Sequence, residues 1–399
     1  MDSVFVYRHP ETTPAKGCPL QGLRIAIQPN ITAAGWPADA GSNALANFTA
    51  LEDATIVQRL RQAGASLCGS TRMSEFGFGL QGSQAGSALQ QQAADAELLL
   101  DFMGESRLAA SRAGVCALKP SWGLVSRFGL IGLIPSMECC GLLSGSLKHI
   151  RDILKTIAGQ DGLDFSLPDE NTPDFSPQKI DPHKTTIGVI TEAQSGLPAG
   201  QATMFRASVD ELKKAGFSLR EMSFPDFPLY SLVHKIVGSV EASCAAGRYD
   251  SVRYGPRAPG AKNWNDMYLL SRGAAFGPLL KSYLFQGAFL QFERYGAFED
   301  ACRIRARLLA GMQQLTSQAD FLVFPAVNGA TDGTPALLPD TYAQFDSTLF
   351  ANVTGQPALY LPPEPGGTDS GFQLAGPRLS DTRLLALAEH LLNMRRGGN

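Results

Sequence analysis

The chain carries a series of short apolar runs that end at glycine, proline or polar residues. Runs of this length next to turn residues are typical of buried strands. They lie at residues 22–28, 65–69, 115–118, 186–190 and 319–325. A further run at 123–129 follows Pro120 and predicts a strand after a turn. Together these segments predict a sizeable sheet.

Longer stretches predict helices, and in two of them the apolar positions fall on one helical face. These two cover residues 54–63 and 146–159. Three more helices are expected at 205–215, at 295–315 and at 88–100, the last of which is rich in Ala, Gln and Leu. Asp53 is the expected N-cap of the first helix.

The order of these segments predicts both the fold class and the domain organisation. Strand, helix and strand follow one another over residues 22–69, which predicts a parallel crossover unit and an α/β fold. Residues 162–184 are rich in Asp, Pro and Ser and predict a surface loop. We expect a single domain over residues 1–399, with a core region at about 20–160 and a second segment at about 185–399.

Composition excludes several classes of function. Of the 399 residues, 44% are hydrophobic and 18% charged, and the formal net charge is −3. That balance lacks the basic footprint of a protein that binds nucleic acid directly, and no apolar run is long enough for a membrane span. The first residues do not have the pattern of a secretory signal, so we expect a cytoplasmic protein.

Cysteine and histidine positions give no sign of a metal or cofactor. The seven cysteines are scattered and include no CxxC pair, so neither a disulfide framework nor a zinc site is expected. The five histidines are dispersed and none lies in a motif with a serine and a carboxylate. We therefore expect no cofactor and no metal.

Residues 101–130, DFMGESRLAASRAGVCALKPSWGLVSRFGL, contain the most distinctive pattern of the chain. This stretch resembles the core motif of the amidase-signature hydrolases, D-T-G-G-S-I-R followed by G-L-K-P-T-x-G-x-V-S-R. Within that family it is most similar to the A subunits of the glutamyl-tRNA(Gln) and aspartyl-tRNA(Asn) amidotransferases. Residues 69–77, 352–358 and 371–376 resemble further family motifs, so the resemblance covers almost the whole chain. It implies a mixed, mostly parallel sheet with helices on both sides.

The same resemblance implies a Lys-Ser-Ser catalytic triad, whose positions are altered here. Gln28 stands where the family has the lysine base, and a glutamine cannot take up a proton near neutral pH. Glu105 stands in the place of the nucleophilic serine. The family's long relay loop is deleted here, residues 82–87 are the candidate remnant of it, and Ser83 is the candidate match for the relay serine.

Two further positions are implied as substrate contacts. The segment 250–255 resembles the family's F-D-G-V-R-Y-G, in which the arginine holds a substrate carboxylate, and this gives Arg253 the role of a carboxylate clamp. The alternative is a structural ion pair. The family also has an aspartate for the substrate amino group, for which Asp346 is the candidate, although gapless counting places Phe345 there.

Glu105 allows two interpretations. It is either a new catalytic carboxylate paired with Asp101, or a residue without a catalytic role that stabilises the N-terminus of a helix. A cysteine at 139 or 140 together with Glu105 and Lys119 would be similar to the Glu-Lys-Cys set of nitrilases, but no spacing places the three together.

From the altered triad we expect a catalytically silent amidase-like protein that acts as a binding or partner subunit. A protein partner and a small carboxylate or amide ligand are the expected interactions. The alternative is an active amidase with rebuilt catalytic residues that releases ammonia from glutamine or a small amide. Fold alone does not decide between these functions.

Phe102 and Met103 replace small residues of the family motif, so we expect a collapsed pocket with one of them packed inward. Glu105 should then be paired with a cation, for which Arg107 is the nearest candidate, or turned to solvent. An open cleft lined by Glu105, Ser83 and Gln28 would instead favour rebuilt catalysis.

Overall fold

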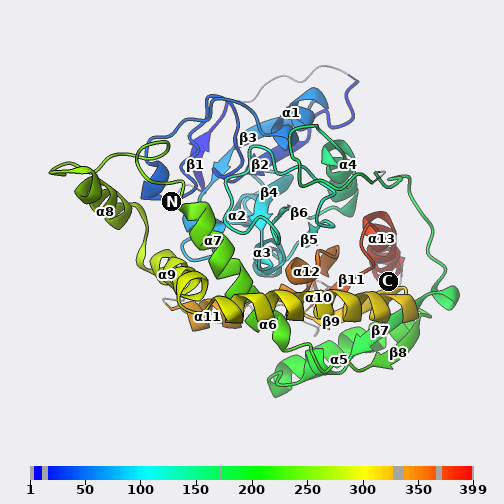
Figure 1. Ribbon diagram of the computed structural model, residues 1–399. Helices are drawn as coiled ribbons and strands as arrows, with labels where there is room; N and C mark the ends of the chain where they lie inside the picture. The colour runs from blue at the N-terminus through cyan, green and yellow to red at the C-terminus, as the bar shows by residue number, and fades with distance from the viewer. Residues whose placement is uncertain (1–3, 11–16, 171, 327–336, 365–370, 398–399) are drawn as a thin grey trace.

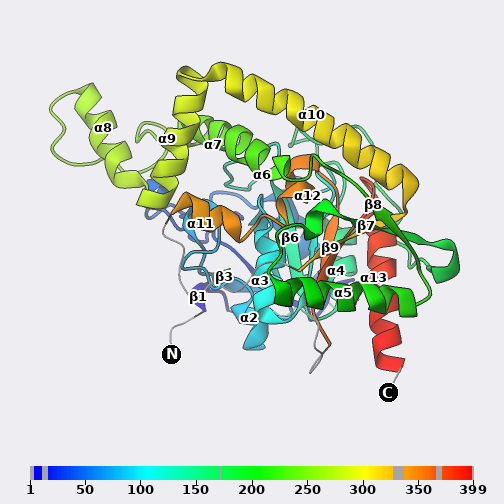
Figure 2. The same cartoon turned by 90° about the horizontal axis from the view of Figure 1, so that it is seen from below.

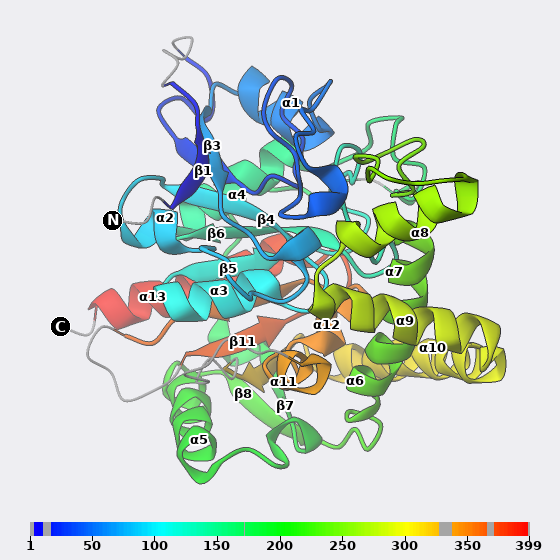
Figure 3. The ribbon, with the colours of Figure 1, turned by 90° about the vertical axis from the view of Figure 1, so that its left-hand side faces the viewer.

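The structure is a computed structural model that describes residues 4–10, 17–170, 172–326, 337–364 and 371–397. One eleven-stranded sheet runs through it in the order β1-β3-β2-β4-β6-β5-β10-β11-β9-β7-β8 (Figure 1). Figure 3 shows this order from β1 at the top to β7 and β8 at the bottom. The sheet therefore contains strands from both sides of the loop at 162–184.

The strands are β1 (Phe5–Arg8), β2 (Arg24–Ile27), β3 (Ser66–Thr71), β4 (Ala96–Asp101), β5 (Cys116–Lys119), β6 (Cys139–Ser144), β7 (Thr186–Ile190), β8 (Ser218–Met222), β9 (Phe321–Pro325), β10 (Ala358–Leu361) and β11 (Phe372–Ala375). The helices are α1 (Thr55–Gln62), α2 (Ser87–Gln90), α3 (Glu105–Ala113), α4 (Leu147–Ile157), α5 (Ala199–Lys214), α6 (Leu229–Val233), α7 (Ser239–Ala246), α8 (Trp264–Ala275), α9 (Pro278–Phe292), α10 (Tyr295–Gln318), α11 (Leu338–Ala343), α12 (Leu349–Thr354) and α13 (Asp381–Gly397).

The α/β class and the mixed sheet are confirmed, whereas the expected excess of parallel pairing is not found. Among the named strands, four pairings are parallel and six are antiparallel. The crossover unit of β2, α1 and β3 is parallel, as predicted. β5 and β6 are antiparallel because the chain returns between them through an irregular loop and not through a crossover helix.

Helices cover both faces of the sheet and bury two apolar cores. One core packs α1, α4, α5 and α13 on one face, and the other packs α3, α7, α9, α10 and α12 on the opposite face. α10 runs along the length of that second layer, and α8 projects from one end of the molecule (Figure 2). In the described ranges, no helix combines the length and the apolar composition needed to cross a bilayer.

Three local predictions are wrong. Residues 88–100 form the short α2 and then β4, because Leu98, Leu99 and Leu100 are fully buried in a strand between β2 and β6. The run 123–129 forms no strand and makes only an isolated bridge from Val125. Asp53 does not cap α1, since its carboxylate accepts a hydrogen bond from the Ala34 amide and pairs with Arg61.

Candidate functional site

The candidate site is the tight turn that joins β4 to α3. The chain leaves β4 at Asp101 and enters α3 at Glu105, so only three residues make the connection. Gly104 has φ +120°, and a Cβ at this position would lie 2.2 Å from the Thr348 hydroxyl. A glycine is therefore required here, both for the backbone conformation and for the close approach of α12.

The Glu105 side chain folds back into this turn. Its Oε2 accepts hydrogen bonds from three successive backbone amides, those of Phe102 at 2.9 Å, Met103 at 2.8 Å and Gly104 at 3.1 Å. Successive amides that converge in this way form an anion-binding concavity, which we call the amide nest of residues 102–104. The N-terminus of α3 adds a favourable field for a negative charge. Glu105 is only 1% exposed.

The nest and the burial have opposite effects on this carboxyl group. Burial, and next the charge of Asp101, raise the pKa of Glu105 to about 8, against the hydrogen bonds from the nest, which lower it. Among the described residues, Oε1 accepts no hydrogen bond. The nest therefore binds one oxygen of the Glu105 carboxyl group. The buried surroundings otherwise disfavour the ionised form of this group.

Arg107 does not pair with Glu105, so that expectation is wrong, and Glu105 is not turned to solvent either. The Arg107 guanidinium lies 3.6 Å from Asp101 and donates to the Asn352 side chain at 2.7 Å and to the Thr348 carbonyl at 3.0 Å. Asp101 also accepts from the Ser106 amide and hydroxyl. The contacts of Arg107 with Asn352 and Thr348 connect α3 to α12 and to the residue before it.

Phe102 and Met103 both pack inward at this turn, as the sequence predicts for at least one of them. Phe102 and Met103 are both 0% exposed. Phe102 stacks on Phe78 with ring centroids 6.1 Å apart, and the Met103 carbonyl accepts a hydrogen bond from the Thr348 hydroxyl. The side chains that replace the family's small residues therefore occupy the interior beside the nest.

His234 is part of this centre, although no motif in the sequence indicates it. Its Nε2 lies 2.8 Å from the Phe102 carbonyl oxygen and its Nδ1 lies 2.9 Å from the Tyr342 hydroxyl, which is 3.1 Å from that of Tyr283. A carbonyl can only accept, so Nε2 carries the proton. Burial lowers the pKa of His234 to about 4, and the ring is neutral near pH 7. His234 thus fixes the orientation of the peptide group between Phe102 and Met103, which carries the middle amide of the nest.

Gln28 and Ser83, to which the resemblance assigns the other two triad positions, belong to separate segments of the chain. Gln28 follows β2 and is 2% exposed. Ser83 lies in a partly exposed turn before α2, where its hydroxyl donates to the Arg72 carbonyl at 3.3 Å and accepts from the Ala85 amide at 3.1 Å. Among the described residues, no hydrogen bond joins Gln28 or Ser83 to Glu105.

Arg253 and Asp346 are both exposed. Arg253 lies in the loop after α7, and its backbone amide donates to Asp250 at 3.1 Å. Asp346 accepts a hydrogen bond from the Ser231 hydroxyl at 3.0 Å, whereas its neighbour Phe345 is 0% exposed. No ion pair in the described part of the chain connects Arg253 or Asp346 to the nest.

Two members of the nitrilase-like set do meet. The Lys119 ammonium lies 3.6 Å from the Cys139 sulfur and donates to the Pro120 carbonyl at 2.7 Å. Lys119 is 0% and Cys139 6% exposed, and burial raises the pKa of the Cys139 thiol. The thiolate is the nucleophilic form of cysteine, so this environment disfavours attack by Cys139.

Metal chemistry would need a group of side chains that could act as metal ligands. Within the described ranges, no cluster of three or more His, Cys, Asp or Glu side chains could hold a metal ion. The chemistry that the site offers is hydrogen bonding and acid–base exchange by buried carboxyl groups.

Comparison with known proteins gives the family. A family model described as Amidase matches residues 8–91 and 102–385. The A subunit of the glutamyl-tRNA(Gln) amidotransferase of Natronomonas pharaonis is 30% identical over 403 residues, which cover 93% of this chain and 95% of the relative. The crystal structure of the corresponding protein from Thermotoga maritima is similar with a TM-score of 0.79 at 19% identity, covering 97% of this chain and 86% of that one.

A chain from a vestigial protein complex linked to the origins of an s-triazine catabolic enzyme, solved with an inhibitor, is similar with a TM-score of 0.77 at 23% identity. The match covers 95% of this chain and 85% of that one. These two structural likenesses concern the fold, whereas the family model and the relative from Natronomonas pharaonis concern the sequence. The chain belongs to the amidase family.

Proposed function

We propose that this chain is a member of the amidase family that does not hydrolyse amides and that acts as a binding or partner subunit. The observation that carries the proposal is the Glu105 carboxyl oxygen in the amide nest of residues 102–104. Acyl-transfer enzymes need converging backbone amides that are free to bind the oxyanion of the transition state. Here a side chain of the protein itself already accepts from all three amides.

The residues at the triad positions support the same proposal. The resemblance assigns the base, the relay and the nucleophile to Gln28, Ser83 and Glu105. A glutamine is not a base near neutral pH, and a carboxyl group held in the nest is not free to attack a substrate. The burial of Phe102 and Met103 leaves the space beside the nest occupied by the chain's own side chains.

One contact favours the alternative of an active amidase with rebuilt residues. Lys119 and Cys139 approach to 3.6 Å, and a lysine beside a cysteine can promote formation of a thiolate. In addition, the raised pKa of Glu105 would let it donate a proton near neutral pH. The proposal of a silent centre is preferred because these groups are buried and the Cys139 thiol is held in its neutral form.

The proposed partner role is supported by the names of the relatives, which are subunits of amidotransferases. It is also supported by the surface of α9, where Phe285, Phe289 and Phe292 are 71%, 53% and 75% exposed. Their spacing of four and three residues places them along one side of the helix. Exposed apolar groups of this kind are more common at interaction surfaces than elsewhere.

Covalent probes test the proposal of a silent centre. We expect a serine-directed fluorophosphonate to leave the folded protein unlabelled, and iodoacetamide to react with the exposed Cys244 and Cys302 but not with Cys139. Stoichiometric fluorophosphonate labelling of Ser83, Ser87 or Ser106, or rapid alkylation of Cys139, would support rebuilt catalysis instead.

A further inference from the structure

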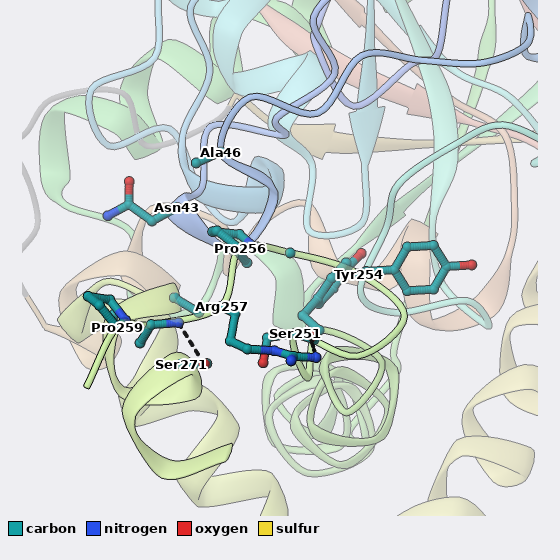
Figure 4. A pocket seen from close by; sticks show the side chains of 14 residues that line it. Asn43, Ala46, Ser251, Tyr254, Pro256, Arg257, Pro259 and Ser271 are labelled. Carbon is teal, nitrogen blue, oxygen red and sulfur yellow. Dashed lines mark hydrogen bonds between the residues drawn. The ribbon is translucent and has the colours of Figure 1, made fainter. Parts of the chain in front are cut away.

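The loop after α7 and the C-terminal end of α8 line a cavity of about 330 Å³ together with the short 3₁₀ helix η1 (Asn43–Leu45). This volume lies at the lower end of the range of small-molecule sites. Figure 4 shows the cavity with the residues that line it. Ala44, Ala275, Pro256 and Pro259 give it apolar walls, and none of the described side chains that line it is acidic.

Arg257 is the only lysine or arginine among the described residues that line this cavity. In Figure 4 its guanidinium lies beside Ser251, whose carbonyl accepts one hydrogen bond from it at 3.4 Å. A guanidinium has five N–H donors, so most of its donor capacity remains for a ligand. Arg253, to which the resemblance assigns the carboxylate clamp, is not among the lining residues.

The cavity is preformed, because hydrogen bonds fix the loop that carries Arg257. Asp250 accepts from the Val252 amide at 2.9 Å and from the Tyr268 hydroxyl of α8 at 3.1 Å. The Ala258 amide donates to Ser271 of α8 at 3.0 Å. Gly255, with φ +93°, lies so close to η1 that a Cβ there would be 2.4 Å from the Ala44 carbonyl oxygen. A preformed site loses little conformational freedom when it binds.

We propose that this cavity binds a small carboxylate with an apolar body, and that Arg257 is its anchor. A single cation in an otherwise uncharged and mostly apolar wall fits one anionic group attached to a hydrophobic remainder. A guanidinium binds a carboxylate through two parallel hydrogen bonds, which gives orientation as well as attraction. The rings of Tyr249 and Tyr254 offer surfaces for a planar or branched apolar group.

This inference rests on the proposed function, because it treats the cavity as a site where a ligand binds without being hydrolysed. Benzoate is a suitable probe because it has a carboxylate and an apolar ring but no amide bond. Its binding is therefore read independently of any ammonia release, so failure of one proposal is distinguishable from failure of the other. Benzamide is the neutral compound of the same shape.

The test is a calorimetric titration of the full chain with benzoate and with benzamide. We expect benzoate to bind, benzamide to bind at least about tenfold more weakly, and Arg257→Gln to weaken benzoate binding by a similar factor. Ala46→Trp, at the exposed rim of the cavity, should block binding while Arg257 remains. Circular dichroism melting confirms that each variant is folded.

Lys262→Gln is the matched control, because it removes an exposed cation from the same loop but not from the cavity wall. We expect this variant to bind benzoate as the natural chain does. The inference is overturned by absence of benzoate binding at millimolar concentration, by equal binding of benzamide, or by unchanged binding in Arg257→Gln. Loss of benzoate binding in Arg253→Gln but not in Arg257→Gln would mean that Arg253, the arginine that the family resemblance indicates, holds the carboxylate.

Discussion

The backbone amide of Met103 donates a 2.8 Å hydrogen bond to the side chain of Glu105, two residues later in the chain. The amides of Phe102 and Gly104 donate to the same oxygen. At the position where the family resemblance places a nucleophile, this chain therefore has an internal ligand for its own backbone. That relationship predicts how the molecule responds to changes at and around position 105.

Removal of the Glu105 carboxyl group should destabilise the fold more than its conversion to an amide. Glu105→Ala leaves three buried N–H groups without an acceptor, and we expect a loss on the order of 3 kcal/mol in the free energy of unfolding. Glu105→Gln keeps an acceptor oxygen and should cost about 1 kcal/mol or less. Urea unfolding measures both, with the exposed Glu52→Ala as control. Equal losses in the two Glu105 variants would mean that the nest contributes little.

Two buried glutamates should make the protein less stable as the pH rises. Burial raises the pKa of Glu97 to about 7 and that of Glu105 to about 8, so the folded state holds their protons to higher pH than the unfolded state does. Their ionisation therefore removes stability as the pH rises from near 4.5 through these values. Glu97→Gln should remove the part of this decline that comes from Glu97. That part is about 3 kcal/mol in the free energy of unfolding between roughly pH 5 and pH 8. An unchanged pH profile in the variant would contradict the assignment.

The amide introduced by Glu97→Gln can retain both contacts of the natural side chain. Glu97 accepts from the Thr71 hydroxyl at 2.7 Å and from the Gly86 amide at 2.8 Å. An amide oxygen can accept from Gly86 while its NH₂ group donates to the Thr71 hydroxyl. The variant is thus expected to fold, and its pH profile is informative.

His234 should have the opposite dependence on pH. Burial lowers the pKa of this imidazole to about 4, so its contribution to stability is complete above the ordinary histidine pKa and is lost as the pH falls through 4. His234→Ala should cost about 3 kcal/mol at neutral pH, from the lost packing and the unpaired Phe102 carbonyl, and should reduce the sensitivity to acid. Thermal unfolding at several pH values measures this, with the exposed His183→Ala as control. A His234→Ala variant as stable as that control would exclude His234 as a support of the nest.

Restoring the family's residues at two positions should not restore catalysis. The double variant Gln28→Lys with Glu105→Ser supplies a base and a nucleophile, but Ser83 remains in a turn where it bonds to Arg72 and Ala85. Catalytic residues that act as a unit yield little when only some are present. We expect no fluorophosphonate labelling at position 105 in this variant. Stoichiometric labelling there would show that the relay position is dispensable.

The sequence predicted the fold class and five of the eleven described strands, and it failed where distant parts of the chain decide the outcome. Residues 88–100 have a helical composition, yet Leu98–Leu100 are buried between two strands and form a third. Glu105 and Arg107 are close in sequence, but residues two apart on a helix do not face each other. Glu105 therefore bonds to the nest amides, and Arg107 bonds to Asn352 and Thr348. The contact between His234 and Phe102 spans 132 residues, and no local pattern could predict it.

The most direct test of a silent centre is ammonia release from glutamine, asparagine and simple amides, measured with the purified natural chain and with Glu105→Gln and Cys139→Ser. We expect all three proteins to release no more ammonia than buffer, because the nest is occupied and Cys139 stays a buried thiol. Release by the natural chain that saturates with substrate, and that is lost in Glu105→Gln or Cys139→Ser, would contradict this expectation.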